Sequence, residues 1–137
     1  MVKNGPCFVL SGDFDPDAIS ARLGIEPTWT MKAGSTNSET GLLIKANYWV
    51  LACGDRDASC DVQDQVVYML SQLENCRAEV AVLCNQYQGD LNLFACVDGN
   101  IPGFWLDANT LRKLAELNVD VDCQYIRSTE LDCKGNL

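Results

Sequence analysis

Short runs of apolar residues, separated by turn-forming residues, predict the strands of this chain. The run 8–10 is apolar and stops at Ser11-Gly12, as a buried strand does when it enters a turn. The stretch 119–126 alternates apolar and polar residues, which is typical of a strand with one buried and one wet face. The polar stretch 34–41 predicts a mobile loop. Further strands are expected at 28–31, 42–53 and 91–97.

Capping residues predict one short helix near the start of the chain and another near its end. Asp15 and Pro16 are residues that favour a helix N-terminus, and Gly24 is suited to the left-handed position that ends a helix. Asp107 and Asn118 give the corresponding signals for the last helix. Its buried side is expected to carry Leu111, Leu114 and Leu117.

The longest helical signal lies between residues 61 and 88, where no glycine or proline occurs. Apolar residues recur there at alternating steps of four and three: Val62, Val66, Met69, Leu73, Cys76, Val80, Leu83 and Tyr87. A coiled coil is the alternative, but the flanking positions lack a complementary charge pattern, so packing against a sheet is favoured. Asn75 is the one internal capping residue and predicts either a kink or two helices end to end.

The resulting order of elements, β-α-β-β-α-β-α-β, predicts an α+β fold. We expect a ferredoxin-like two-layer sandwich, with a mostly antiparallel sheet of four or five strands and the helices on one face. The 137 residues are enough for a single domain, 1–137, with its own hydrophobic core.

The eight cysteines are expected to be free thiols in a cytoplasmic protein. The N-terminus lacks an apolar signal segment, and no apolar run is long enough to cross a membrane. The closest cysteine pairs, Cys53 with Cys60 and Cys76 with Cys84, are too far apart for a zinc knuckle, and the chain has no histidine. We therefore expect no metal and no cofactor. Cysteines that fall in predicted strands, where a thiol usually packs, are Cys7, Cys53, Cys96 and Cys123.

The formal net charge of −9 argues against nucleic acid as a partner, because the ten basic residues form no cluster. The acidic residues are scattered over several predicted elements. A solvated surface therefore explains them more simply than mimicry of nucleic acid does.

Known catalytic and metal-binding patterns are missing from the sequence. The absence of histidine removes the usual serine and cysteine triads, and no phosphate loop or dinucleotide fingerprint occurs. Asp13, Asp15 and Asp17 have the spacing that opens a calcium loop, but Ala18 and Gly24 stand where that loop needs glycine and glutamate. We assign no catalytic residue. Helix capping accounts for two of the three aspartates.

Aromatic residues near the ends of predicted elements indicate a ligand- or partner-binding groove. Trp49 and Tyr48 are considered for it, with ordinary core packing as the alternative. The turn 12–14 and the loop 99–106 each follow a strand and precede an aspartate-capped helix, so we expect them at the same end of the sheet. The residues proposed to bind there are Asp13, Trp29, Lys32, Phe104 and Trp105.

A non-catalytic binding or regulatory module, such as a partner-binding or immunity-type protein, is the function we favour from the sequence. Its partner is expected to be a protein or a small molecule. The alternative is a small enzyme that uses Asp13 or a cysteine in the aromatic groove.

Several motifs resemble a bacterial family described as domain of unknown function 4279. They are Leu-Ser-Gly-Asp-Phe-Asp-Pro-Asp-Ala-Ile-Ser-Ala-Arg-Leu-Gly-Ile-Glu-Pro-Thr (10–28), Trp29, Lys32-Ala-Gly34, Tyr48-Trp49 and Pro102-Gly-Phe-Trp-Leu106. The similarity covers nearly the whole chain, and the G-D-F-x-P turn followed by L-G-I-x-P-T is its most specific part. The resemblance supports the fold expectation and implies no activity.

Overall fold

The structure, a computed structural model, describes residues 5–52, 61–97 and 104–127. Its elements are, in chain order, β1 Cys7–Gly12, α1 Pro16–Leu23, β2 Trp29–Met31, β3 Asn47–Ala52, α2 Val62–Leu73, the 3-10 turn η1 Glu74–Cys76, α3 Arg77–Gln86, β4 Gln88–Val97, α4 Ala108–Glu116 and β5 Asp120–Arg127. The α+β class and the predicted order of strands and helices are confirmed. The predicted break near Asn75 is also confirmed, because η1 separates α2 from α3.

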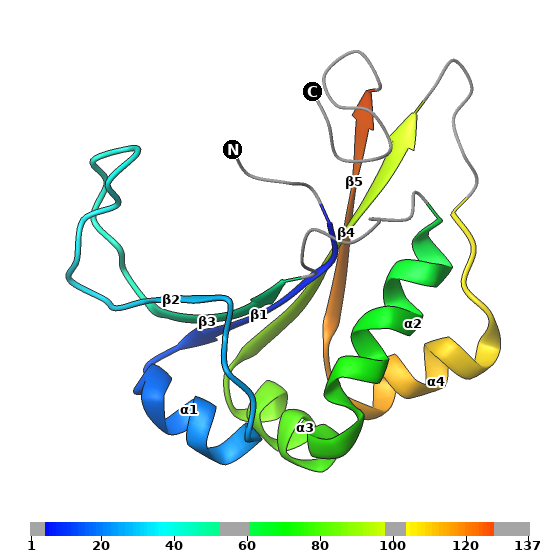
Figure 1. The fold of residues 1–137 in the computed structure, drawn as a ribbon, viewed down its shortest axis with the longest axis horizontal. Helices are drawn as coiled ribbons and strands as arrows, with labels where there is room; N and C mark the ends of the chain where they lie inside the picture. Colours follow the sequence, from blue (N-terminus) through cyan, green and yellow to red (C-terminus); the bar gives the residue numbers. More distant parts are fainter. Residues whose placement is uncertain (1–4, 53–60, 98–103, 128–137) are drawn as a thin grey trace.

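The five strands form one sheet in the order β2-β3-β1-β4-β5. Neighbouring strands are antiparallel except β4 and β5, which are parallel. We expected a mostly antiparallel sheet; the sheet is instead mixed, because the chain returns through α4 and adds β5 in the same direction as β4. The helices lie together on one side of the sheet (Figure 1).

The core forms where alternate strand residues meet the helices. Phe8 and Leu10 of β1 pair with Leu51 and Trp49 of β3, and all four contribute to or pack against the apolar core. Trp49 is fully buried; its ring packs edge-on against Phe8, and its Nε1 donates a hydrogen bond to the hydroxyl of Ser20 in α1. Trp49 therefore serves the core, and the idea that it lines a groove is wrong.

The predicted caps form as expected. Asp15 Oδ1 accepts the backbone N–H of Asp17 at 3.0 Å, and Asp107 Oδ1 accepts that of Thr110 at 2.7 Å. Gly24 ends α1 with φ of 69°, and Asn118 follows α4 with φ of 59°. Each cap satisfies N–H groups that the first turn of a helix leaves without partners.

Several predicted boundaries were wrong. β4 starts at Gln88, three residues earlier than the expected strand at 91–97, and glycine suits position 89 because a Cβ there would overlap with Sγ of Cys84. β3 starts at Asn47, five residues later than expected. Leu111 is 51% exposed, because it lies on the flank of α4 while Leu114 faces the core.

The stretch expected to be a mobile loop is held by backbone hydrogen bonds. Gly34 N–H donates to Ile44 C=O and Asn37 N–H donates to Leu42 C=O, so the chain doubles back as a narrow arm. This arm projects from the sheet beyond β2 and β3 (Figure 1). Predicted features outside the described residues are Cys53, Cys60, most of the loop 99–106 and the tail from Ser128.

Candidate functional site: the face between α2 and α4

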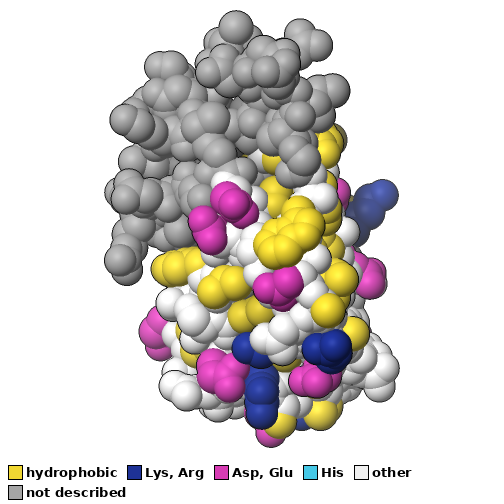
Figure 2. Space-filling view, turned by 90° about the vertical axis from the view of Figure 1, so that its right-hand side faces the viewer, with side chains coloured by type: hydrophobic (Ala, Val, Ile, Leu, Met, Phe, Trp, Pro, Cys, Tyr) yellow, Lys and Arg dark blue, Asp and Glu magenta, His cyan; other side chains and the backbone are white. Residues whose placement is uncertain are grey.

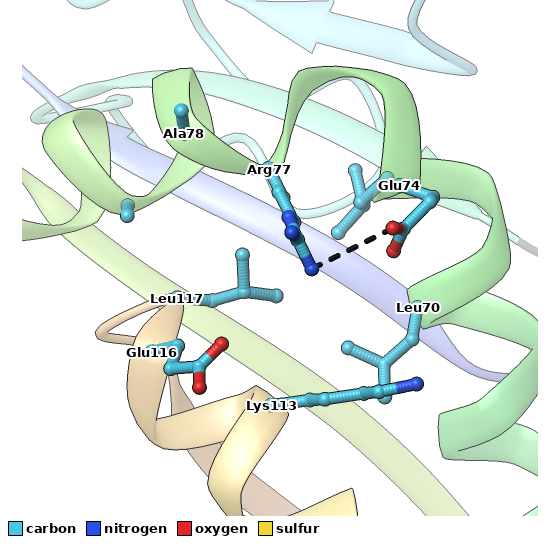
Figure 3. Close-up of a pocket in the computed structure, with 9 residues that line it drawn as sticks. Leu70, Glu74, Arg77, Ala78, Lys113, Glu116 and Leu117 are labelled. Atoms are coloured by element: carbon cyan, nitrogen blue, oxygen red, sulfur yellow. Dashed lines mark ion pairs between the residues drawn. The ribbon is translucent and has the colours of Figure 1, made fainter.

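The break between α2 and α3 leaves a pocket of about 220 Å³ beside α4. Its lining comes from all three helices and from η1: Leu70, Leu73, Glu74, Arg77, Ala78, Ala81, Lys113, Glu116 and Leu117. Figure 3 shows Leu70 and Leu117 converging on this space from opposite sides. The pocket exists because the chain turns away at η1, so that no continuous helix fills the space in front of the C-terminal half of α4.

The pocket has an apolar floor and a charged rim. Arg77 Nη1 lies 3.6 Å from Glu74 Oε1, in an exposed ion pair that spans one turn (Figure 3). Such a pair contributes at most about 1 kcal/mol to stability. Lys113 and Glu116 of α4 add one charge of each sign. The arrangement can take an apolar group on its floor and orient it by polar contacts at the rim.

Exposed apolar side chains continue from the pocket along α2. Gln63, Val67, Leu70 and Glu74 recur at steps of three and four, so they share one side of this helix. Gln63 contacts α4, Leu70 and Glu74 line the pocket, and Val67 between them is 49% exposed. This side of α2 therefore presents exposed apolar surface between the start of α4 and the pocket.

Two exposed aromatic residues lie just before α4, whose start is held against α2 by Gln63. Phe104 and Trp105 precede α4 directly; both are exposed, and Trp105 is 65% exposed. We call the surface formed by Val67, Leu70, Phe104, Trp105 and the pocket the α2–α4 face. Figure 2 shows apolar side chains gathered across the middle of the side of the molecule that faces right in Figure 1, with acidic side chains among and around them and basic side chains mostly below.

A side-chain amide fixes the start of α4 against α2. Gln63 Nε2 donates to Asp107 Oδ2 and to the hydroxyl of Thr110, both at 2.9 Å, and its Oε1 accepts the backbone N–H of Asp107. The backbone N–H of Thr110 is the main cause that lowers the pKa of Asp107, and the hydrogen bonds from the Thr110 and Gln63 side chains act in the same direction. These contacts give the α2–α4 face a defined shape.

A second amide ties α2 to the sheet. β1 pairs with β4 only as far as Asn92, and beyond that point Gln65 bonds to both backbone groups of Phe94. Its Oε1 accepts the Phe94 N–H at 3.0 Å, and its Nε2 donates to the Phe94 C=O. Gln65 thus takes the place of the next strand residue.

The described thiols are poorly suited to nucleophilic chemistry. Burial raises the pKa of Cys7, Cys76 and Cys123, and it raises the pKa of Cys84 to about 12 with help from the carboxylates of Asp90 and Asp120. Because the thiolate is the reactive form, these four cysteines are mostly protonated at neutral pH. Within 5–52, 61–97 and 104–127, no group of three histidine, cysteine or acidic residues is arranged to hold a metal ion.

Three of the predicted site residues lie at one end of the sheet. Met31 and Ser11 both pair with Tyr48, so β2 and β1 end at the same level. Lys32 and Asp13 follow these ends and are separated by two strand spacings, about 10 Å. Trp29 lies on β2, opposite Val50 of β3. A shallow hollow beside the end of α1 lies near them, but it is lined by Asp17, Ser20, Ala21, Gly24, Ile25, Glu26, Pro27 and Thr30.

Phe104 and Trp105 lie at the other end of the sheet, so the expected common groove is wrong. Ser11, just before the Gly12 turn, pairs with Gln88 at the start of β4. Gln65 binds Phe94, and Gln63 binds Asp107, so the start of α4 lies about six residues, or roughly 20 Å, further along β4. The error arose because β4 runs antiparallel to β1, which sends the chain after β4 away from the turn after β1.

The sequence analysis singled out Trp105, which is exposed, and missed the pocket. The sequence did indicate the side of the pocket that α2 and η1 form, because the expected break near Asn75 is where α2 ends and the pocket opens. The other side comes from α4, and the sequence contained no signal that α4 packs beside this break.

A family model described as "Domain of unknown function (DUF4279)" matches residues 7–127. The chain therefore belongs to this family, and the resemblance noted in the sequence is confirmed. Comparison with curated proteins and with solved structures gives no match. Over the described residues, the helices are all too short or too polar to cross a membrane.

Proposed function

We propose that this chain is a non-catalytic binding module that docks a partner protein on its α2–α4 face. The observations that carry the proposal are a 65% exposed tryptophan, Trp105, just before α4, and an apolar pocket of about 220 Å³ at the far end of the same helix. Tryptophan is enriched among the few residues that dominate protein interfaces.

The dimensions of the pocket favour an apolar side chain as the group that enters it. An apolar cavity of about 150 Å³ is large enough for a benzene ring, so the pocket has room for one leucine or aromatic side chain. Glu74, Arg77, Lys113 and Glu116 at the rim supply contacts for polar groups beside that side chain. The net charge of −9 favours a basic partner, because opposite charge speeds the encounter.

An immunity-type role, in which the module neutralises its partner by covering it, falls within this proposal. A cytoplasmic location is part of it as well. The support is that the described cysteines Cys7, Cys76, Cys84 and Cys123 are free thiols, which are typical of a reducing compartment. The raised pKa values of these thiols weigh against the enzymatic alternative.

Pocket-filling variants test the proposal. Ala78→Trp places an indole in the pocket, and Ala115→Trp places the same group on an exposed position of α4 outside it. Wild type and both variants serve as bait in affinity purification from the native host, after circular dichroism has shown equal folding. The recovered partner is then titrated against each variant by calorimetry.

We expect wild type and Ala115→Trp to bind one partner equally, while Ala78→Trp and Trp105→Ala weaken binding at least about tenfold, the usual effect of losing a central contact. Equal binding by all four proteins would show that the partner docks elsewhere. Turnover of a small-molecule substrate by the purified protein would contradict the non-catalytic reading.

We propose further that the first four strands form a ferredoxin-like arrangement to which α4 and β5 are added. The support is the strand order β2-β3-β1-β4, its antiparallel pairings, and helices after β1 and β3. Nuclear Overhauser contacts between amides of β3 and β1 and of β1 and β4 test this order. Contacts between β1 and β2 in their place would contradict it.

A further inference from the structure

Among residues 5–52, 61–97 and 104–127, no strand pairs with the outer edge of β5, so this long edge of the sheet is open there. β5 is the last strand of the sheet over the described residues, and its eight residues pair only with β4. The opposite edge is β2, which has three residues. An open edge of this length presents a row of backbone N–H and C=O groups that can pair with another strand.

The helix layer leaves the margin along β5 uncovered. Val121, Cys123 and Tyr125 point to the side of the sheet that carries the helices, because Cys123 packs against the core. Val121 and Tyr125 are nevertheless exposed, Tyr125 by 53%. The helices therefore do not fill the space above this edge, and an incoming strand would find an apolar strip beside it.

Pairing of β5 with itself is restricted to a few registers. A twofold axis perpendicular to the sheet keeps the helix-covered faces of both copies on the same side. One residue of β5 must then lie opposite the same residue of the other copy. With Asp122 at the centre, two carboxylates face each other, which is unfavourable. With Gln124 at the centre, the apolar residue Val121 lies opposite a charged residue, Arg127, which is a poor match. With Cys123 at the centre, Val121 lies opposite Tyr125, and Asp122 opposite Gln124, twice each.

We propose that the outer edge of β5 pairs antiparallel with β5 of a second copy of this chain, in the register centred on Cys123. This register joins the two exposed apolar strips, matches each Asp122 carboxylate with a Gln124 amide, and continues one sheet through both copies. The proposal does not depend on the α2–α4 face, which lies on other elements.

The net charge of the chain predicts how the stability of such a dimer depends on salt. Each copy carries a formal net charge of −9, so the two copies repel each other over a distance that salt shortens. The dimer should therefore become tighter as the salt concentration rises, whereas an interface held by ion pairs would become weaker.

Sedimentation equilibrium of the full chain tests the assembly. We expect a monomer–dimer equilibrium whose dissociation constant falls between 50 and 500 mM sodium chloride, by roughly tenfold if the screened repulsion amounts to about 1.4 kcal/mol. Tyr125→Glu should raise the constant at least about tenfold, because it places a carboxylate against Val121. Val82→Glu is the matched control: Val82 is equally exposed, at 50%, on α3.

Oxidation with diamide, which takes up the two thiol hydrogens, tests the register. Directly opposed residues of antiparallel strands lie about 4.5–5.5 Å apart, within the range that a disulfide spans. Peptide mapping should find Cys123 joined to Cys123 of the other copy, and Cys123→Ser should lose this cross-link while it still dimerises. A monomer at every salt concentration, a dimer unaffected by Tyr125→Glu, or a dimer without the Cys123 cross-link would each overturn the proposal.

Discussion

The helices α1 and α4 carry the same local signals but are held in place differently. Each begins at an aspartate, and each ends at a residue with positive φ, Gly24 or Asn118. The cap of α1 is local, because Asp15 accepts a hydrogen bond from Asp17 two residues later. The cap of α4 is also a junction, because Asp107 accepts a second hydrogen bond from Gln63 of α2.

The difference extends along both helices. α1 is fastened from its middle and end, where Ser20 accepts from Trp49 and Arg22 pairs with Glu79 in an exposed contact. The region of α2 and α4 is fastened by amides: Gln63, Gln65 and Asn118 each bond to a distant segment. α4, which forms one side of the candidate binding face, thus has both of its ends fixed.

The largest expected effect separates the two sides of α4. Leu114→Ala should lower the free energy of unfolding by about 2–5 kcal/mol, because Leu114 is buried and a cavity remains after truncation. Leu111→Ala, on the exposed flank, should change it by less than about 0.5 kcal/mol. Urea denaturation measures both. Equal losses would mean that α4 is rotated from the orientation described.

The second-largest effect is expected at Gln65, whose side-chain amide ties α2 to β4. Gln65→Ala should destabilise the protein by about 2–3 kcal/mol, because it removes a buried side chain and leaves the N–H and C=O of Phe94 without these partners at a partly buried place. Gln72→Ala, on the exposed side of α2, is the control and should be nearly neutral. If the two variants unfold alike in urea, Gln65 does not serve as a strand substitute.

Removal of the α2–α4 tie should have a smaller and more local effect. Gln63→Ala should lower stability by about 1 kcal/mol, since it removes hydrogen bonds to Asp107 and Thr110 at a half-buried site. Hydrogen exchange should become faster at the Thr110 amide and stay unchanged at the Asp17 amide of α1. Equal acceleration at both amides would contradict the difference between the two caps.

The smallest expected effect is a pH dependence that belongs to α4. The pKa of Asp107 is lowered in the folded state, so its contribution is fully present above the ordinary carboxyl pKa of 3.8 and is lost as pH falls through the lowered value. Between pH 6 and pH 3, wild type should therefore lose more stability than Asp107→Asn. Identical acid profiles in thermal unfolding would show that the carboxylate is not held as described.

The sequence by itself determined the features that depend on neighbouring residues. Asp15 with Pro16, and Asp107 with Asn118, mark helix ends because capping joins groups only a few residues apart. The alternation in β5 and the spacing in α2 and α3 follow from the geometry of one element. The order of strands and helices and the family could be predicted for the same reason.

Only the tertiary structure decided which ends of these elements meet. The antiparallel pairing of β1 with β4 sends Asp13 and Trp105 to opposite ends of the sheet, although the loops that carry them look alike in sequence. Trp49 became core and Trp105 stayed exposed for the same reason: a side chain is buried only where another element lies over it. The pocket needed α4 beside the break at η1, and that contact joins residues about forty positions apart, which no local pattern encodes.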